Sequence, residues 1–402
     1  MTGTSNSRET ESRHRVQWPV EVVLILALLV AGMWFGVQVR RIWLRSSFTD
    51  FALVWTAARH FSGGAALYDV EGLRAHPFGS FYKYPPFVGV FLAPFASMPA
   101  VDAARGYVIV CLVLYVLTFF LIVRVESFAQ RSLPFYLLAI GMLVFQPALD
   151  TLFGAQHECL LLFLFAVAYS ALVRPVAAQM SAGACLGFAA IVKLYPLLFL
   201  IGLAVQRYWR ACLALIATFA ALTVLSAATA GWSLERHFYV EVLPILSGAT
   251  AWLENQSIAG FFGRLFVDGA RVDPSVVSVG APAVVLAKVA GVMCLALSGW
   301  TLRSTKTAAD IFTILIPLAL LITPDAWIHY ETVLLLPFGI LLGDVFRNFS
   351  AGRAATLAIA FGLLAAGNEV TMRAAPPGLL HSYKFFGVLL FWLIAVRRRG
   401  SS

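Results

Sequence analysis

Long apolar runs dominate the sequence, and they restrict the possible folds more than any other feature. Several runs, such as residues 104–123 and 211–230, reach the roughly 20 residues that an α-helix needs to cross a bilayer. Backbone groups in lipid must be hydrogen-bonded within the protein, so only helices and closed barrels can span a membrane. The runs are continuous and do not alternate, which argues against a barrel. We therefore predict an all-α polytopic membrane protein.

Composition agrees with this class. Of 402 residues, 60% are apolar and 12% are charged, whereas soluble domains average about 45–50% and about 25%. The net charge of +9 comes from Lys and Arg residues that stand singly or in pairs between apolar runs, which is a topology signal and no nucleic-acid footprint. The cysteines lie within apolar runs without paired spacing, so we expect no disulfide, metal site or cofactor: Cys111, Cys159, Cys185, Cys212 and Cys294.

The apolar runs predict about twelve spans within one unit, residues 1–402. Two long segments stay outside the spans, at residues 40–103 and 231–281. The first contains amphipathic stretches at 50–62 and 85–99 that could lie along the membrane surface. The expected spans are 19–39, 104–123, 133–148, 157–173, 181–192, 194–206, 211–230, 282–302, 308–323, 331–346, 354–372 and 382–396.

Charge predicts the orientation in a bacterial inner membrane. With the N-terminus in the cytoplasm, the short outer loops carry only Lys193, Arg373 and Lys384. The inner side then carries Arg124, Arg131, Arg174, Arg207, Arg210, Arg303, Lys306, Arg347, Arg353 and Arg397 to Arg399. Both long segments face the periplasm in this topology. An alternative makes 181–206 one helix and lets 85–99 cross, but it moves Arg124, Arg131 and Arg174 outside.

Polar residues near apolar spans are candidates for function, because they are costly there. Asp50 follows the first span and could act as a general base, although an aspartate at this place could also cap the helix that follows. Tyr84 could stack on a sugar or anchor the chain at the interface. Gln156 and His157 enter an apolar helix, where they could line a wet cavity or belong to the helix start.

The remaining candidates include basic and amide side chains. Lys193 stands between two apolar runs, where it could bind an anionic lipid phosphate or extend to the interface. Trp327 and His329 cluster at a helix start and could bind sugar or phosphate. The second long segment contributes polar residues that we group with this cluster: Asn255, Gln256 and Arg264. Zincin, disulfide-redox, P-loop and serine-hydrolase motifs do not occur in the sequence.

Taken in order, these motifs resemble glycosyltransferase family 87, the polyprenyl-phosphate-sugar-dependent transferases of GT-C type, whose mycobacterial members extend phosphatidylinositol mannosides. Each motif is weak alone, but their order and their shared topological side are fairly specific. The matching stretches are Asp50-Phe51 to Ala57-Ala58, Gly64 to Tyr68, Tyr84-Pro85-Pro86 to Pro94, Gly154 to Gln156, Lys193 to Pro196, Asn255 to Ser257, and Pro324 to Tyr330.

The resemblance implies a GT-C bundle with a large first periplasmic loop that bears membrane-surface helices. It implies that Asp50 is the catalytic base, that His329 binds the donor phosphate or handles a proton, and that Lys193 contacts the lipid phosphate. The expected partners are a polyprenyl-phosphate sugar, a lipid or glycan acceptor and membrane lipids. Mannose is the sugar that the family favours. Glu158 departs from the amide or apolar residue expected beside the Gly-Gln motif.

The expected reaction is hexose transfer with inversion: Asp50 deprotonates an acceptor hydroxyl, which attacks the anomeric carbon. Polyprenyl phosphate then leaves, stabilised by Lys193, Arg264 and His329. A transporter or flippase for a lipid-linked sugar is the main alternative, but it predicts midplane charges and paired broken helices, and no inverted repeat is visible. A non-catalytic membrane scaffold would leave the polar clusters unexplained.

Overall fold

The structure, a computed structural model, describes residues 18–60, 67–75, 81–266, 279–305, 307–367 and 380–398. Every regular element within these ranges is helical, and the β-type pairing there is one isolated bridge between Asn255 and Trp327. The all-α prediction is therefore confirmed. Gly64, Lys306, Arg373 and Arg399, to which the sequence assigned roles, lie outside the described residues.

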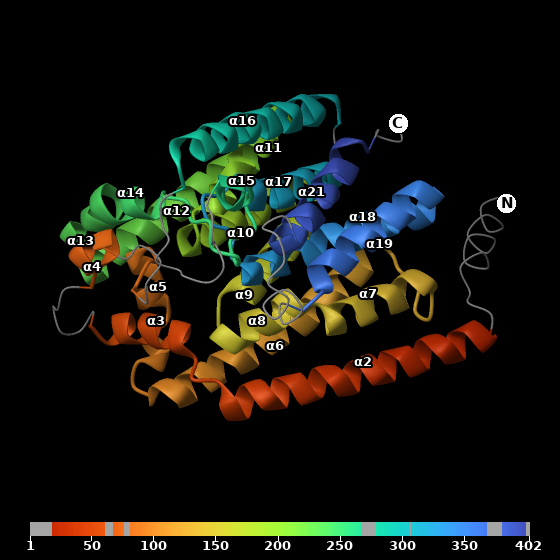
Figure 1. Ribbon diagram of the computed structural model, residues 1–402, viewed down its shortest axis with the longest axis horizontal. Coiled ribbons are helices and arrows are strands. Elements are labelled where there is room, and N and C mark those ends of the chain that lie inside the picture. The colour runs from red at the N-terminus through yellow and green to blue at the C-terminus, as the bar shows by residue number, and fades with distance from the viewer. Residues whose placement is uncertain are drawn as a thin grey trace.

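Figure 1 shows the arrangement of the helices. The first half of the chain contains α2 (Trp18–Arg45), α3 (Thr49–His60), α4 (Val70–Ala75), α5 (Pro86–Phe91), α6 (Ala100–Val125), α7 (Leu133–Val144), α8 (Gln146–Gly154), α9 (Glu158–Leu172), α10 (Gln179–Val192), α11 (Phe199–Val205) and α12 (Trp209–Ala230). The second half contains α13 (Trp232–His237), α14 (Leu243–Leu246), α15 (Ile258–Phe266), α16 (Ala281–Ser304), α17 (Ala308–Ile322), α18 (Leu335–Arg347), α19 (Ala351–Ala365) and α21 (Tyr383–Val396). Short 3₁₀ segments include η1 (Ala93–Phe95), η2 (Val176–Ala178), η3 (Tyr195–Leu198), η5 (Ile328–Leu334) and η6 (Leu380–Ser382), and a π segment, η4, covers Phe238–Val242.

Five helical segments in the described ranges are long and apolar enough to cross a membrane. They are α2, α6, α12, α16 and the continuous stretch Ile328–Arg347. A sixth results if α7 and α8, bent by 42° at their junction, count as one span. Each of the twelve expected spans contains helix, but helices such as α9 and α17 have 15 residues, or about 22 Å. The chain is a polytopic membrane protein, and the count of twelve stays a prediction.

The helix is interrupted near Lys193, where the two predicted topologies differ. Helix α10 ends at Val192, and Lys193 has extended backbone angles, φ −141° and ψ 133°. Residues 181–206 are therefore not a single helix. The segment 85–99 contains α5, with 6 residues, and the short η1. Neither is long enough to cross a bilayer on its own. In the first topology the span 194–206 contains α11, with only 7 residues, so the choice between the two topologies stays a prediction.

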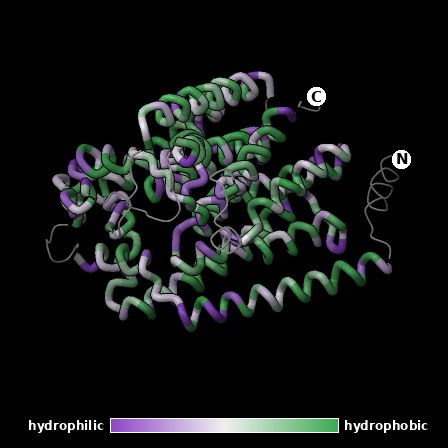
Figure 2. The backbone as a smooth tube through the Cα atoms, viewed as in Figure 1, coloured by the Kyte–Doolittle hydropathy of each residue, from purple (hydrophilic) through white to green (hydrophobic). Residues whose placement is uncertain are grey.

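The longest helices form the edges of the molecule. In Figure 1, α2 and α16 run along opposite edges, with α9, α17, α18 and α21 between them. Figure 2 shows mostly apolar residues along α2 and α16. Their large side chains are nevertheless exposed, for example Met33 and Trp300. Exposed apolar helices of this kind suit a lipid environment.

One end of the bundle carries arginines paired with buried carboxylates. Arg347 bonds Glu126 at 2.9 Å, Arg353 pairs with Asp344, and Arg398 lies 3.5 Å from Asp310. We call this the arginine end. It joins the C-terminal ends of α6, α18 and α21 to the start of α17 and α19.

Helices α10 and α12 pack closely because glycine removes the side chain between them. A Cβ atom at Gly183 would collide with the backbone oxygen of Ala211, and one at Gly187 with that of Leu215. Small residues four apart allow such close backbone approach between membrane helices. This contact matters for the site, because α10 delivers Lys193 at its end.

We predict that Gly183→Ala destabilises the protein by about 1–3 kcal/mol, since the methyl group would collide with backbone. Gly299→Ala is the matched control, because nothing lies within 4 Å of the Cβ position at Gly299 in helix α16. The control should be neutral or stabilised by up to about 1 kcal/mol through helix propensity. Thermal unfolding of the detergent-solubilised variants measures both; equal effects would contradict the packing argument.

Candidate active site

A cavity of about 710 Å³ lies where several helices stop. Its walls come from the start of α3, the segment 81–85, the α8–α9 link, the α10–η3 link, the loop after α14, and the segment that joins α17 to η5. Ionisable and amide side chains from all these places line it: Asp50, Lys83, Gln156, Lys193, Glu254, Asp325 and His329. Residues far apart in sequence therefore meet in one pocket.

Asp50 lies in the first turn of α3, and its side chain is exposed. Its Oδ2 atom accepts a hydrogen bond of 2.8 Å from Nε2 of Gln156. Gly154 approaches the same oxygen so closely that a Cβ atom there would lie 3.0 Å from it. The carboxylate is thus held from one side and faces the cavity with the other.

Gln156 is fixed by a second contact. The hydroxyl of Tyr84 donates to its Oε1 atom at 2.5 Å, which directs the amide nitrogen to Asp50. Helix α8 ends because Ala155 adopts the left-handed conformation, φ 48° and ψ 48°, before α9 begins at Glu158. This conformation is uncommon outside glycine. The reversal places Gln156 in the cavity wall.

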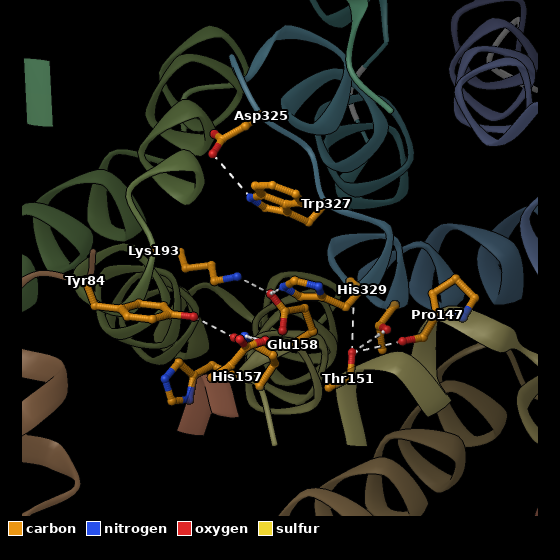
Figure 3. A network of polar contacts seen from close by, with 12 residues as sticks. Tyr84, Pro147, Thr151, His157, Glu158, Lys193, Asp325, Trp327 and His329 are labelled. Carbon is orange, nitrogen blue, oxygen red and sulfur yellow. Dashed lines mark hydrogen bonds and ion pairs between the residues drawn. The ribbon is translucent and has the colours of Figure 1, made fainter. Parts of the chain in front are cut away.

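Glu158 forms the centre of a buried charge cluster behind that wall (Figure 3). Its Oε1 atom pairs with Nζ of Lys193 and lies 3.9 Å from Nε2 of His329. The Lys193 ammonium also lies 3.4 Å from the ring centre of Tyr330, a cation–π contact. Lys193 and His329 reach Glu158 from opposite sides and still line the cavity.

Two further carboxyl groups face the cavity, Glu254 and Asp325. Desolvation raises the pKa of Asp325 to about 7, against the opposing effect of Lys83, and desolvation also raises the pKa of Glu254 to about 7. The indole nitrogen of Trp327 donates to Asp325 at 3.2 Å, and the Trp327 ring packs on Trp252 with 5.0 Å between centroids. Both tryptophans line the cavity.

Six of the ten residues selected from the sequence line this cavity: Asp50, Tyr84, Gln156, Lys193, Trp327 and His329. His157 does not: it is 1% exposed, and its Nδ1 atom shares a hydrogen bond of 2.6 Å with the Tyr107 hydroxyl. His157 therefore lies behind the wall, with its ring between Tyr84 and Tyr107.

Asn255, Gln256 and Arg264 also lie behind the wall. The Asn255 amide donates to Pro324 O and accepts from the Ala326 nitrogen, and thereby holds the segment that carries Asp325 and Trp327. Gln256 accepts from the Phe385 nitrogen at the start of α21. Arg264 donates to Asn255 O at 2.7 Å and to Ser382 Oγ at 3.0 Å. Their side chains build the wall, and direct contact with substrate stays a prediction for them.

Glu254 was not selected from the sequence, Asp325 entered only within the stretch Pro324 to Tyr330, and the partner of Lys193 was not anticipated. Glu254 could have been selected because it is a carboxylate in a stretch rich in apolar and aromatic residues, directly before Asn255. Lys193 was expected to need an anionic partner, and the structure supplies one within the chain, Glu158.

An all-helical membrane bundle with one cavity lined by carboxylates, basic side chains and tryptophans is typical of an integral membrane enzyme that acts on a polar substrate. The model of glycosyltransferase family 87 matches residues 81–324. The chain therefore belongs to this family and is a glycosyltransferase, which confirms the resemblance and the enzyme class.

Similarity to known proteins extends over most of the chain. A polyprenol-phosphate-mannose-dependent alpha-(1-2)-phosphatidylinositol mannoside mannosyltransferase of Mycobacterium tuberculosis is 25% identical over 386 residues, which cover 90% of this chain and 84% of the relative. The crystal structure of ArnT from Cupriavidus metallidurans bound to undecaprenyl phosphate has a TM-score of 0.46 and 12% identity, and the match covers 93% of this chain and 76% of that one.

The raised pKa of Asp325 predicts a pH-dependent effect of Asp325→Asn. The wild-type carboxyl is neutral in the folded state below about pH 7 and in the unfolded state only below about pH 4. Its contribution to stability is fully present below about pH 4 and is lost progressively as the pH rises to about 7. Thermal unfolding should show the variant close to wild type at pH 4 and more stable than wild type at pH 8; the same difference at both pH values would refute this linkage.

Proposed function

We propose that the protein transfers a hexose, with mannose as the first candidate, from a polyprenyl-phosphate donor to a lipid or glycan acceptor. The observation that carries the proposal is the exposed Asp50 carboxylate in a cavity that also contains Lys83, Lys193 and His329. Family membership and the donor named for the mycobacterial relative support the donor class.

Asp50 acts as the general base. It takes the proton of an acceptor hydroxyl while that oxygen forms a bond to the anomeric carbon of the donor sugar. The bond from that carbon to the phosphate oxygen breaks, and the electron pair leaves with polyprenyl phosphate. One displacement inverts the anomeric configuration. The hydrogen bond from Gln156, itself oriented by Tyr84, fixes the direction of the carboxylate.

The basic side chains of the cavity stabilise the leaving phosphate. Lys83, Lys193 and His329 all line it, and fixed donors of this kind stabilise charge that develops in a transition state. Arg264 supports the cavity wall from behind, because it donates to the backbone oxygen of Asn255, next to Glu254. Trp252 and Trp327 provide apolar faces on which a sugar ring can pack.

The cavity opens on the periplasmic side of a bacterial inner membrane. The arginine end lies at the opposite ends of the helices that lead to the cavity: α9 starts at the cavity with Glu158, and α18 follows His329 and ends at Arg347. Cytoplasmic ends of membrane helices are enriched in Lys and Arg, which supports a cytoplasmic arginine end and a cavity on the other side.

Asp50→Asn should reduce transfer by at least about 100-fold, because it removes the base while keeping the shape of the side chain. The assay uses purified protein in nanodiscs, a panel of radiolabelled polyprenyl-phosphate sugars, a lipid extract as acceptor, and release of polyprenyl phosphate as the signal. Asp102→Asn is the matched control, since Asp102 is an exposed aspartate that faces Arg105 on α6.

Full turnover by the Asp50 variant would remove this residue from the mechanism. Absence of turnover with every donor, together with movement of a lipid-linked sugar across sealed vesicles, would favour the transporter alternative.

A further inference from the structure

The charge balance around Lys193 is unusual for a residue that should bind an anionic substrate. Lys193 is 6% exposed, and Glu158, which is fully buried, already neutralises it. The rings of Tyr330 and Tyr84 lie 3.4 and 5.9 Å from its ammonium group. The charge of Lys193 is therefore already partly neutralised by Glu158 before a second anion, such as a phosphate, enters the cavity.

The same carboxylate also faces the neighbouring base. Oε1 of Glu158 lies 3.9 Å from Nε2 of His329, so one oxygen serves two of the basic groups that line the cavity. The other oxygen, Oε2, is buried and has no hydrogen-bond partner among the residues that the structure describes. Glu158 is fixed as the first residue of α9. It cannot move away easily when a substrate arrives.

We propose that Glu158 is a resident counter-anion that weakens the affinity of the cavity for lipid phosphate and thereby promotes release of the polyprenyl phosphate product. This inference rests on the proposed function, since it assumes that a phosphate lies near Lys193 and His329. Glu158 is a positioning residue, because it acts through these two side chains and does not line the cavity.

The physical reason is the repulsion between two anions that share one cation, Lys193. A carboxylate fixed behind Lys193 and beside the His329 ring opposes a phosphate in front of them, and the low dielectric of the site strengthens this effect. The donor is a phosphodiester with one negative charge, whereas the product is a phosphomonoester with a charge of about −1.5 to −2 at neutral pH, so a cavity with unopposed cations would hold the product strongly. Product release limits turnover in many enzymes, and a fixed counter-anion shortens the time that the product stays bound.

Glu158→Gln tests the proposal, because it removes the charge and keeps the shape. Binding of a short-chain prenyl phosphate to the purified protein in nanodiscs should become about tenfold tighter, while binding of the matching prenyl alcohol should not change. In the transfer assay, KM for the donor and kcat should both fall, as expected when substrate and product are held more strongly. A merely structural role for Glu158 would weaken phosphate binding.

Three variants serve as controls. Glu158→Asp keeps the charge and should keep phosphate affinity closer to wild type than Glu158→Gln does. Glu126→Gln neutralises another buried, ion-paired glutamate at the arginine end and should leave phosphate binding unchanged. In a Lys193→Met background, Glu158→Gln should lose most of its effect, because the shared cation is gone.

The outcomes separate the two hypotheses. If wild-type protein binds the prenyl phosphate no better than the alcohol and transfers no sugar, the proposed function fails. If wild-type protein prefers the phosphate but Glu158→Gln binds it equally or less tightly, while Glu158→Asp remains folded and active, the counter-anion inference is overturned and the proposed function stands.

Discussion

Inside a bilayer, an ionised side chain without a partner is unstable by several kcal/mol, and this constraint determines where the charges of the protein lie. At the arginine end, Glu126 and Asp344 are paired with Arg347 and Arg353. Behind the cavity, Glu158 is paired with Lys193. Helix α21 adds Lys384, fully buried and 3.8 Å from Glu331. The bundle therefore accepts charge mainly as pairs.

The cavity residues are found where regular helix stops. Lys193 follows α10 in an extended conformation, Gln156 follows a left-handed residue, and the segment before η5 contains Asp325 and Trp327. At such positions the backbone no longer directs side chains into the helix packing, so polar groups can point into a water-accessible space. The long helices supply the frame, and their interruptions supply the chemistry.

Much of this arrangement follows from the sequence. The apolar runs predicted the class of fold, and the alternation of inner and outer loops placed Asp50, Lys193 and His329 on one side of the membrane, where they meet in one cavity. The predicted number of spans between these residues gives all three the same side. Helix lengths were less predictable, because a broken element such as η3–α11 has the same composition as a continuous one.

The side-chain partners could not be read from the sequence. Asn255 and Gln256 are polar residues beside an apolar stretch, as cavity residues would be, yet their amides bond backbone groups of other segments. The pairing of Glu158 with Lys193 depends on how α9 and α10 are aligned along their axes. Single-sequence patterns specify faces of helices and leave this axial alignment open.

The contacts of α21 also bear on how the enzyme matures. Phe385 N in its N-terminal turn donates a hydrogen bond to Gln256, and the preceding Ser382 accepts one from Arg264. Lys384 lies beside Glu331, two residues after His329. Two walls of the cavity are thus supported by a helix that the ribosome makes late. A partly synthesised chain can insert its early helices and remain without a finished site. We therefore expect the walls of the cavity to be complete only after α21 has packed against the rest of the bundle.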